Sequence, residues 1–142
     1  MDVNKLLKAL EDDSNEHLFN YTTQKLREMN FKIIKELQLS KEHTLDLMNK
    51  LKEYKYVDEM NELKYGTYIR WIPLTDPDNI VLTKGSIFCE YKITDAGVFI
   101  VCKNFGFSEK KYFQFKMDEC IVFQKLTNQE QVLLSALDHL SK

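Results

Sequence analysis

The chain has 142 residues, 44% of them hydrophobic and 30% charged, and its net charge is −2. This composition is typical of a folded domain with its own hydrophobic core and excludes a chain that is disordered throughout. The small negative charge argues against a general nucleic-acid coat protein and against a polybasic membrane binder. No apolar run approaches the ~18 residues of a membrane-spanning helix, and Met1–Lys5 lacks a signal-peptide pattern. We therefore expect a cytoplasmic or nuclear protein without membrane association.

The first helices are expected in a region without helix breakers, because residues 1–65 contain no glycine and no proline. The apolar residues Val3, Leu6, Leu7 and Leu10 share one face of a short first helix. The segment Asp13–Glu16 offers an N-cap and an acidic first turn to a second helix. Its apolar stripe, which we expect to be buried, consists of Leu18, Leu26, Met29, Ile33 and Leu37, widened by Phe19 and Ile34.

A third helix is predicted to begin after Ser40 as its N-cap. Its apolar positions are Leu47, Met48, Leu51 and Tyr54. The pattern leaves open whether this helix continues through Val57, Met60 and Leu63. Near the other end of the chain, Thr127 and Glu130 form a capping-box pattern that begins a C-terminal helix. The apolar positions of that helix are Val132, Leu133, Ala136, Leu137 and Leu140.

The middle of the chain has the composition of an antiparallel sheet. All four glycines and both prolines lie between residues 66 and 106, among many β-branched and aromatic residues. Strands are predicted over 66–74, 86–94 and 98–102, with two more inside 111–125, and Thr75–Asn79 is a loop. Met117–Cys120 is either the tight turn between the last two strands or a bulge in one long bent strand.

A turn at Thr94–Gly97 fixes the register of the strands that it joins. If Ile93 pairs with Val98, then Tyr91 lies opposite Ile100 and Cys89 lies opposite Cys102. One face of the strand over 86–94 then carries Ile87, Cys89, Tyr91 and Ile93, and the other carries Phe88, Glu90 and Lys92. We expect the cysteines to stay free thiols, because a reducing compartment keeps them so.

The expected fold class is α+β. N-terminal helices occupy residues 1–65, a five-stranded antiparallel meander occupies 66–126 and a C-terminal helix occupies 127–142, in one compact domain overall. Five short strands with short connections favour a small SH3-like or Tudor-like barrel. The alternative is a flat sheet with helices packed on one face.

The sequence contains no recognisable catalytic, metal or cofactor motif. Cys89, Cys102 and Cys120 have no CxxC spacing, and none of the three histidines (His17, His43 and His139) lies near them in the sequence. Phosphate-binding loops, nucleophile elbows and metalloprotease motifs are also missing. We therefore expect neither a metal nor a cofactor, and a role other than catalysis.

Arg70 and Trp71 are the most conspicuous pair of candidate binding residues. As neighbours in a strand, they point to opposite faces of the sheet. If Trp71 packs in the core, Arg70 is the exposed residue that faces a partner; if Trp71 faces outward, it is a recognition platform. Core packing is favoured, because this is the only tryptophan and its burial removes much apolar surface from water.

A second candidate set mixes lysines with aromatic residues, as grooves for single-stranded nucleic acid do. The lysines of the sheet region are Lys84, Lys92, Lys103, Lys110, Lys111, Lys116 and Lys125. Those closest to aromatic residues are Lys103, Lys110 and Lys111, which alternate with Phe105 and Tyr112. The competing interpretation is that the lysines are solvated and protect edge strands from aggregation.

Three stretches of the sheet region resemble a group of viral proteins. Gly66–Ile72, Cys102–Asn104, and Tyr112–Thr127 with Gln129 and Glu130 are similar to small uncharacterised proteins of nucleocytoplasmic large DNA viruses. The resemblance covers residues 66–130 and brings no activity and no catalytic residues with it. It implies a viral protein located in the cytoplasm or nucleus of the host cell, or in the virion.

Two functions are expected from these patterns. The first is a non-enzymatic protein-interaction or assembly protein, in which the barrel or sheet binds a protein partner and the helices pack on it or self-associate into an oligomer. The alternative is a nucleic-acid-binding accessory factor that uses the basic and aromatic face of the sheet. Binding to single-stranded DNA that weakens steeply with salt would distinguish the alternative from the first function.

Overall fold

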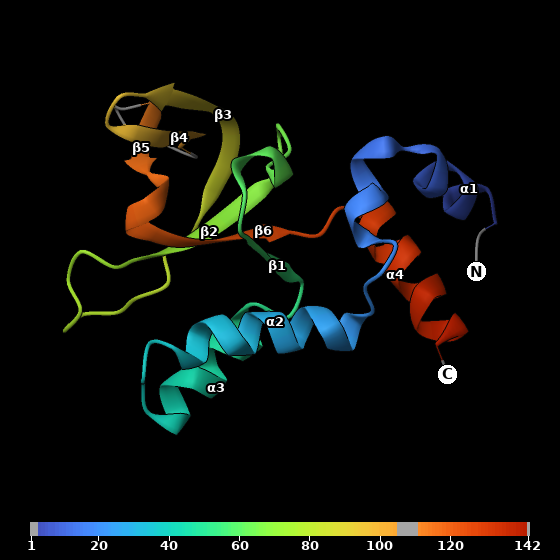
Figure 1. The fold of residues 1–142 in the computed structure, drawn as a ribbon, viewed down its shortest axis with the longest axis horizontal. Helices are drawn as coiled ribbons and strands as arrows, with labels where there is room; N and C mark the ends of the chain where they lie inside the picture. Colours follow the sequence, from blue (N-terminus) through green and yellow to red (C-terminus); the bar gives the residue numbers. More distant parts are fainter. Residues whose placement is uncertain (1–2, 105–110, 142) are drawn as a thin grey trace. The chain divides into compact units, whose positions relative to one another are not determined.

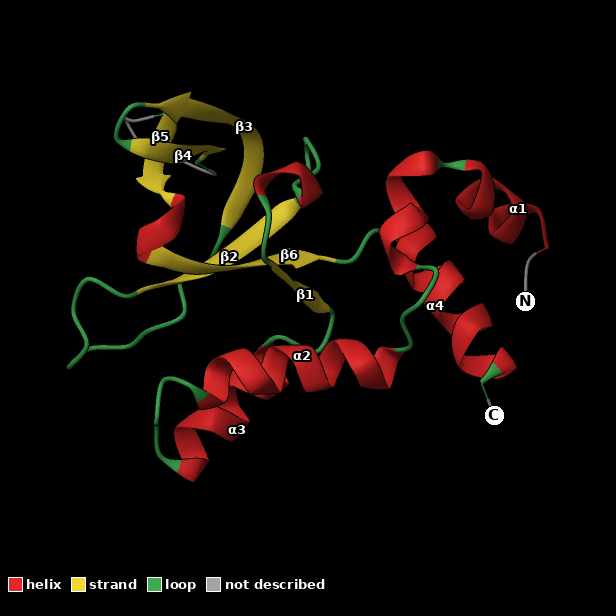
Figure 2. Ribbon diagram, in the orientation of Figure 1, coloured by secondary structure: helices red, strands yellow, loops and turns green. Residues whose placement is uncertain are grey.

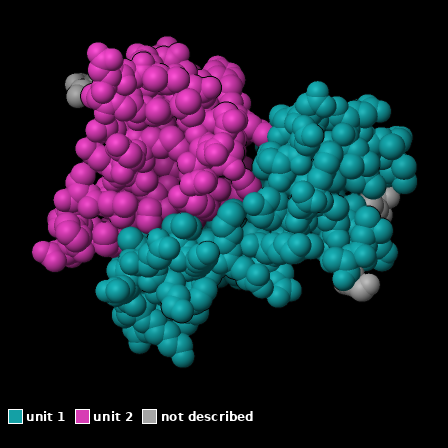
Figure 3. Space-filling model, viewed as in Figure 1, with its two compact units in different colours: residues 1–53, 126–142 teal, residues 54–125 magenta. Residues whose placement is uncertain are grey.

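The structure, a computed structural model, describes residues 3–104 and 111–141, and it divides into two units. Unit 1 consists of residues 1–53 and 126–142, and unit 2 of residues 54–125 (Figure 3). Unit 1 is helical and unit 2 contains the sheet (Figures 1 and 2). Helices together with one antiparallel sheet confirm the α+β class, and the association of the two units in one domain stays a prediction.

Unit 1 contains four α-helices, most of which begin at a side-chain cap. They are α1 (Val3–Glu11), α2 (Thr23–Lys35), α3 (Lys41–Lys50) and α4 (Asn128–Leu140). The Ser40 hydroxyl accepts a hydrogen bond from the His43 N–H at 3.1 Å, as predicted for α3. The predicted capping box of α4 is also confirmed, because Thr127 and Glu130 each accept a hydrogen bond from the other's backbone N–H.

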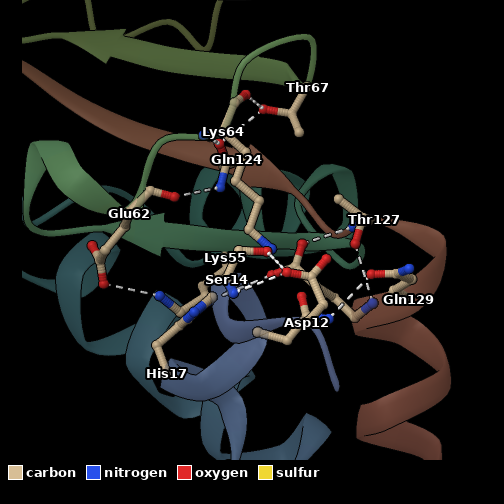
Figure 4. Close-up of polar contacts among 12 residues, drawn as sticks. Asp12, Ser14, His17, Lys55, Glu62, Lys64, Thr67, Gln124, Thr127 and Gln129 are labelled. Atoms are coloured by element: carbon tan, nitrogen blue, oxygen red, sulfur yellow. Dashed lines mark hydrogen bonds and ion pairs between the residues drawn. The ribbon is translucent and has the colours of Figure 1, made fainter. Parts of the chain in front are cut away.

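The predicted second helix is split in two. Asp12 caps the 3₁₀ helix η1 (Asp13–Leu18), and its carboxylate accepts hydrogen bonds from the Ser14 N–H at 3.0 Å and the Ser14 hydroxyl at 2.7 Å (Figure 4). The chain then turns, and Thr22 caps α2 by accepting a hydrogen bond from the Lys25 N–H at 3.2 Å. Two capping side chains ten residues apart in sequence therefore start two separate helical segments.

This break changes which residues of α2 are buried. The predicted stripe is correct at Leu18 and Leu26, which are buried, but Met29, Ile33 and Leu37 are only half-buried and Phe19 is exposed. The buried positions of α2 are Leu26, Asn30 and Ile34, which follow each other at intervals of four residues. The core of unit 1 joins α1, η1, α2 and α4 through Ala9, Leu18, Leu26, Leu133 and Leu134.

Unit 2 is a six-stranded antiparallel sheet with the order β1-β6-β2-β3-β4-β5. The strands are β1 (Tyr54–Val57), β2 (Tyr68–Pro73), β3 (Ser86–Thr94), β4 (Gly97–Lys103), β5 (Tyr112–Lys116) and β6 (Cys120–Lys125). The five predicted strands are present, and β1 is an additional one. The third helix does not continue through Val57 and Leu63, because residues 54–57 pair with β6 and residues 60–62 form the 3₁₀ helix η2 (Met60–Glu62).

The sheet is open, so a closed SH3-like barrel is not what the chain forms. The 3₁₀ helix η3 (Met117–Glu119) separates β5, which pairs with β4, from β6, which pairs with β2 and β1. Met117–Cys120 is therefore neither a tight turn between paired strands nor a bulge in one strand. It is a corner at which the chain crosses from one edge of the sheet to strands near the other edge (Figure 1).

The hairpin register is confirmed near the turn and wrong beyond it. Ile93 pairs with Val98 and Tyr91 with Ile100, as predicted, but Cys102 pairs with Phe88 instead of Cys89. A β-bulge between Phe88 and Glu90 inserts Cys89 as an extra residue. The bulge reverses the alternation, so Phe88 joins Tyr91 on one face and their rings stack with centroids 6.5 Å apart. The three cysteines are free thiols.

A buried glutamine holds the segment between β1 and β2 on β6. The Gln124 side-chain carbonyl accepts hydrogen bonds from the Lys64 N–H at 2.7 Å and the Thr67 hydroxyl at 2.8 Å, and its amide donates to the Glu62 carbonyl at 3.0 Å (Figure 4). Satisfying the polar atoms of a buried side chain in this way avoids a desolvation penalty of roughly 1–3 kcal/mol for each lost partner. Gln124 therefore fixes the path of the chain from η2 to β2.

Candidate functional site

The two faces of the sheet in unit 2 have opposite chemistry. On the core face, cross-strand neighbours form the rows Phe88–Cys102–Phe113 and Tyr91–Ile100–Phe115. On the other face, which we call the outer face, the rows are Ile87–Lys103–Tyr112, Glu90–Val101–Gln114 and Lys92–Phe99–Lys116. Apolar residues dominate the first set, whereas three lysines and a tyrosine occupy the second.

Trp71 belongs to the core, as the favoured interpretation of the sequence has it. Its side chain is 7% exposed and stacks on Phe115 with ring centroids 4.4 Å apart. Phe113 lies beside it at 5.5 Å. Because these contacts remove Trp71 from the surface, it cannot act as a recognition platform, and it leaves the set of candidate binding residues.

Arg70 points away from the core and is half-buried. Its Nε donates a hydrogen bond to the Thr83 carbonyl at 2.8 Å, and the Trp71 N–H next to it donates to the Thr83 hydroxyl at 3.1 Å. The Tyr68 hydroxyl donates to the Lys84 carbonyl at 2.6 Å. These contacts fasten residues 83–84 to β2, so the guanidinium of Arg70 has a structural role and Lys84 is held beside Tyr68.

The lysines of the outer face differ in how far their charges are neutralised. Lys92 lies 3.8 Å from Glu90, and Lys116 lies 3.8 Å from Asp118. Within residues 3–104 and 111–141, no carboxylate forms an ion pair with Lys84, Lys103 or Lys111, and all three are exposed. Lys103 therefore carries uncompensated positive charge on the outer face, and Lys84, held beside Tyr68, and Lys111, next to Tyr112 in the chain, are exposed residues that border the sheet.

The structure brings together part of the predicted binding set. Lys103 and Tyr112 are direct cross-strand partners, and Lys111 precedes Tyr112, with its carbonyl accepting the Asn104 N–H at 2.9 Å. Phe105 and Lys110 lie outside the described residues. Tyr65, Glu90 and Lys92 lie on the same surface as Tyr112 but are absent from the predicted set. Strict alternation along 86–94 would have found Glu90 and Lys92, whereas no sequence pattern points to Tyr65.

A hollow on the outer face lies at the β-bulge. It has a volume of about 460 Å³ and is lined by Tyr65, Cys89, Glu90, Lys92, Val101 and Tyr112. Tyr65 is 82% exposed and Tyr112 is 52% exposed, so both rings are accessible to solvent. The hollow therefore combines two accessible aromatic rings with one carboxylate and one ammonium group.

A second hollow marks the place where the sheet stays open. It has a volume of about 520 Å³, and its lining comes from β1, β4, η3, β6 and the neighbouring turns. The apolar residues of this lining include Val57, Val98, Met117 and Val122, and the polar ones include Asp58 and Asp118. Its lining is more apolar than polar.

Two of the three cysteines of the sheet, Cys102 and Cys120, lack the character of nucleophiles. Burial, helped by the neighbouring Cys89, raises the pKa of the Cys102 thiol to about 12. Burial, helped by Glu119 and Asp118, raises the pKa of Cys120 to about 11. Both thiols are therefore protonated at neutral pH. The part of the chain that the structure describes also contains no cluster of metal-ligating side chains and no helix long and apolar enough to cross a bilayer.

Unit 1 contains a buried carboxyl group in contact with a histidine, and an exposed apolar stripe. The Glu130 side chain, which is 2% exposed, lies 3.4 Å from His17 Nε2 and accepts the Thr127 N–H at 2.9 Å. These contacts tie η1 to the first turn of α4. On α1, the predicted apolar face carries Val3, Leu7 and Leu10, and all three are exposed. Comparison of the chain with protein-family models, with curated proteins and with solved structures gave no match.

Proposed function

We propose that this protein binds single-stranded nucleic acid through the outer face of β3, β4 and β5. The observation that carries the proposal is the placement of Lys92 and Lys103 on one face with the accessible rings of Tyr65 and Tyr112, next to the exposed loop residues Lys84 and Lys111. A strand of nucleic acid needs cations for its phosphates and flat apolar rings for its bases, and this surface offers both. The viral origin implied by the resemblance over residues 66–130 also remains a proposal, and an accessory factor for viral nucleic acid would agree with it.

The excess of positive charge on the outer face arises from the direction in which the side chains of the strands point, and not from the composition of unit 2. Residues 54–125 contain ten lysines and arginines and ten aspartates and glutamates, so unit 2 is neutral as a whole. On the outer rows of the three strands, however, three lysines face one glutamate. This local excess of positive charge favours the binding of a polyanion even though the net charge of the chain is −2.

The test is the affinity of the protein for a labelled single-stranded oligonucleotide, measured by fluorescence anisotropy at several salt concentrations. Replacing Lys84, Lys103 and Lys111 by glutamine should weaken binding strongly at low salt. Because each phosphate contact contributes about −0.7 to the slope of log K against log salt for single strands, the slope should become shallower by about 2.

A matched control carries the same change of charge in unit 1. Lys32, Lys35 and Lys41 are exposed residues of the helical unit, and their replacement by glutamine should leave affinity and slope nearly unchanged. A duplex of the same sequence should bind more weakly, since its stacked bases cannot reach the tyrosines. Absence of binding by the wild type at about 50 mM salt, where phosphate contacts are strong, would contradict the proposed function.

A second candidate function is self-association through α1. Val3, Leu7 and Leu10 are 63%, 49% and 45% exposed, and their spacing places them on one side of the helix. An antiparallel pair of α1 helices would cover both stripes. It would also bring Lys5 and Lys8 of one copy near Glu11 and Asp13 of the other, which gives the contact complementary charge.

Sedimentation equilibrium tests this second function. The wild type should show a concentration-dependent dimer, and Leu7→Gln should abolish it, because a polar side chain would be placed at the centre of the contact. Val81→Gln is the control, as Val81 is a similarly exposed apolar residue in unit 2. A wild type that stays monomeric at all concentrations would exclude the contact between copies.

A further inference from the structure

The hollow at the β-bulge has features that phosphate binding alone does not require. Lysines on a flat sheet would suffice to hold a polyanion, but this surface also contains a hollow of about 460 Å³, which is bordered by two accessible tyrosines. Exposure of two large rings leaves apolar surface in water, which the fold itself does not need. Two accessible rings at the border of one hollow are, however, an arrangement that a flat ligand can use.

Backbone hydrogen bonds fix Tyr65 beside the bulge. The Gly66 N–H donates to the Phe88 carbonyl at 2.9 Å, and the Phe88 N–H donates to the Thr67 carbonyl at 2.8 Å. Gly66 has φ of +81°, a left-handed conformation that glycine adopts without strain. The turn that carries Tyr65 is thus attached to the residue that begins the bulge, and the Gln124 contacts to Lys64 and Thr67 hold it from the other side.

The remaining groups of the hollow come from the regular pairing of the sheet. Tyr112 is placed by its pairing with Lys103, and Val101 lies between Glu90 and Gln114 in the next row. Because Cys89 is the extra residue of the bulge, Glu90 and Lys92 face the outer side together with Val101. One carboxylate, one ammonium group and an aliphatic side chain thus share the hollow with the two tyrosines.

We propose that this hollow is a binding subsite for one unstacked nucleobase of a single strand. This inference rests on the proposed function, because Lys92 and Lys103 of the same face would hold the flanking phosphates. The base stacks on Tyr65 or Tyr112, and the Glu90 carboxylate accepts a hydrogen bond from an exocyclic amino group. A carboxylate acceptor favours bases that carry an amino group, such as cytosine and adenine, over thymine and uracil.

The first test removes the rings and then restores them. Tyr65→Ala and Tyr112→Ala should together weaken binding of an oligo-dC strand by roughly 5- to 150-fold, the range that corresponds to the stacking of one base. The variants Tyr65→Phe and Tyr112→Phe keep the rings and should bind like the wild type. An oligonucleotide with abasic positions should bind the wild type as weakly as oligo-dC binds the double alanine variant.

The second test concerns base preference. Oligo-dC should bind the wild type more tightly than oligo-dT, and Glu90→Gln should reduce this difference, because an amide offers a donor as well as an acceptor. Circular dichroism and thermal unfolding of each variant establish that it is folded.

The outcomes separate the subsite from the proposed function. If oligonucleotides bind with a steep salt dependence but the alanine variants and abasic strands lose nothing, the subsite is refuted and the proposed function stands. If dC and dT bind equally and Glu90→Gln changes neither, the role of Glu90 is wrong. If no strand binds at about 50 mM salt, the proposed function and the subsite both fail.

Discussion

Gly85 shows how one residue supports the surface that we propose to be functional. Its φ is +94°, and a Cβ atom at this position would lie 2.5 Å from the Ile69 carbonyl oxygen and 2.8 Å from Arg70 Cγ. Only glycine allows residues 83–85 to approach β2 so closely and to place Lys84 beside Tyr68.

We expect Gly85→Ala to lower the free energy of unfolding by more than the ~1–3 kcal/mol of a strained φ alone. Gly66→Ala is the control, since Gly66 has φ of +81° but nothing within 4 Å of the added Cβ. Urea denaturation of both variants measures the difference. Equal losses would mean that β2 moves aside without cost.

The neighbouring residues Ile33 and Ile34 both belong to the predicted apolar stripe of α2, but they differ in how deeply they are buried. Ile34 is fully buried and Ile33 is half-buried. Ile34→Ala should cost about 2–5 kcal/mol of unfolding free energy, whereas Ile33→Ala should cost clearly less. Urea denaturation of the two variants compares them directly. A larger loss for Ile33→Ala would contradict the orientation of α2 described above.

Glu62 makes the stability of unit 2 depend on pH. Burial alone would raise the pKa of its carboxyl group, but the Glu59 N–H, the Lys55 ammonium at 3.0 Å and the Asp58 N–H together hold this pKa below its ordinary value of 4.5. The ionised carboxylate is thus bound more favourably in the folded chain than in the unfolded chain.

A lowered pKa in the folded state contributes stability that is fully present above pH 4.5 and is lost as the pH falls through the folded-state value. We therefore expect the free energy of unfolding of the wild type to drop more steeply below pH 4.5 than that of Glu62→Gln. Chemical denaturation at a series of pH values measures both curves. Parallel curves would show that the carboxylate contributes nothing.

At the scale of secondary-structure elements, the β-bulge in β3 decides which cysteine is accessible. Regular alternation would place Cys89 opposite Cys102 on the core face, but the inserted residue brings Cys89 to the outer hollow. Cys102 stays buried in the core, and the raised pKa values of Cys102 and Cys120 keep both thiols protonated.

Iodoacetamide should therefore modify Cys89 first in the folded protein, because thiolate formation and access control the rate. Mass spectrometry of peptides from timed reactions identifies the modified residue. The Cys89→Ser variant should lack the early phase, and unfolded protein should react at all three cysteines. Early modification of Cys102 would contradict the register of β3 and β4.

Local sequence signals predicted α3, α4 and β3 well. For the two helices, the signal is itself a hydrogen bond made by the capping side chain. Ser40 and Thr127 cap α3 and α4, and the bounds predicted for β3 are those observed. The strand β1 was missed because Tyr54–Val57 follows a helix without any breaker, and its conformation depends on pairing with β6, far away in the sequence. Pairing partners so distant leave no local trace.

At the scale of the whole molecule, positive charge is sorted by face. Alternation along β3, β4 and β5 directs apolar residues to the core around Trp71 and lysines to the outer face. The sequence predicted Lys103, Lys111 and Tyr112 as a set because they lie near one another along the chain. It missed Tyr65, which reaches the surface of Tyr112 only because backbone hydrogen bonds attach its turn to Phe88.

The sequence by itself determined the fold class, the caps of α3 and α4 and the hairpin at Thr94–Gly97, and it favoured the burial of Trp71. Each of these depends on composition, on alternation or on contacts between residues close in the chain. Only the tertiary structure decided the additional strand, the open sheet, the bulge at Cys89 and the hollow between Tyr65 and Tyr112. The physical reason is that register and strand order are set by contacts across the sheet, where a single inserted residue reverses the face of every side chain beyond it.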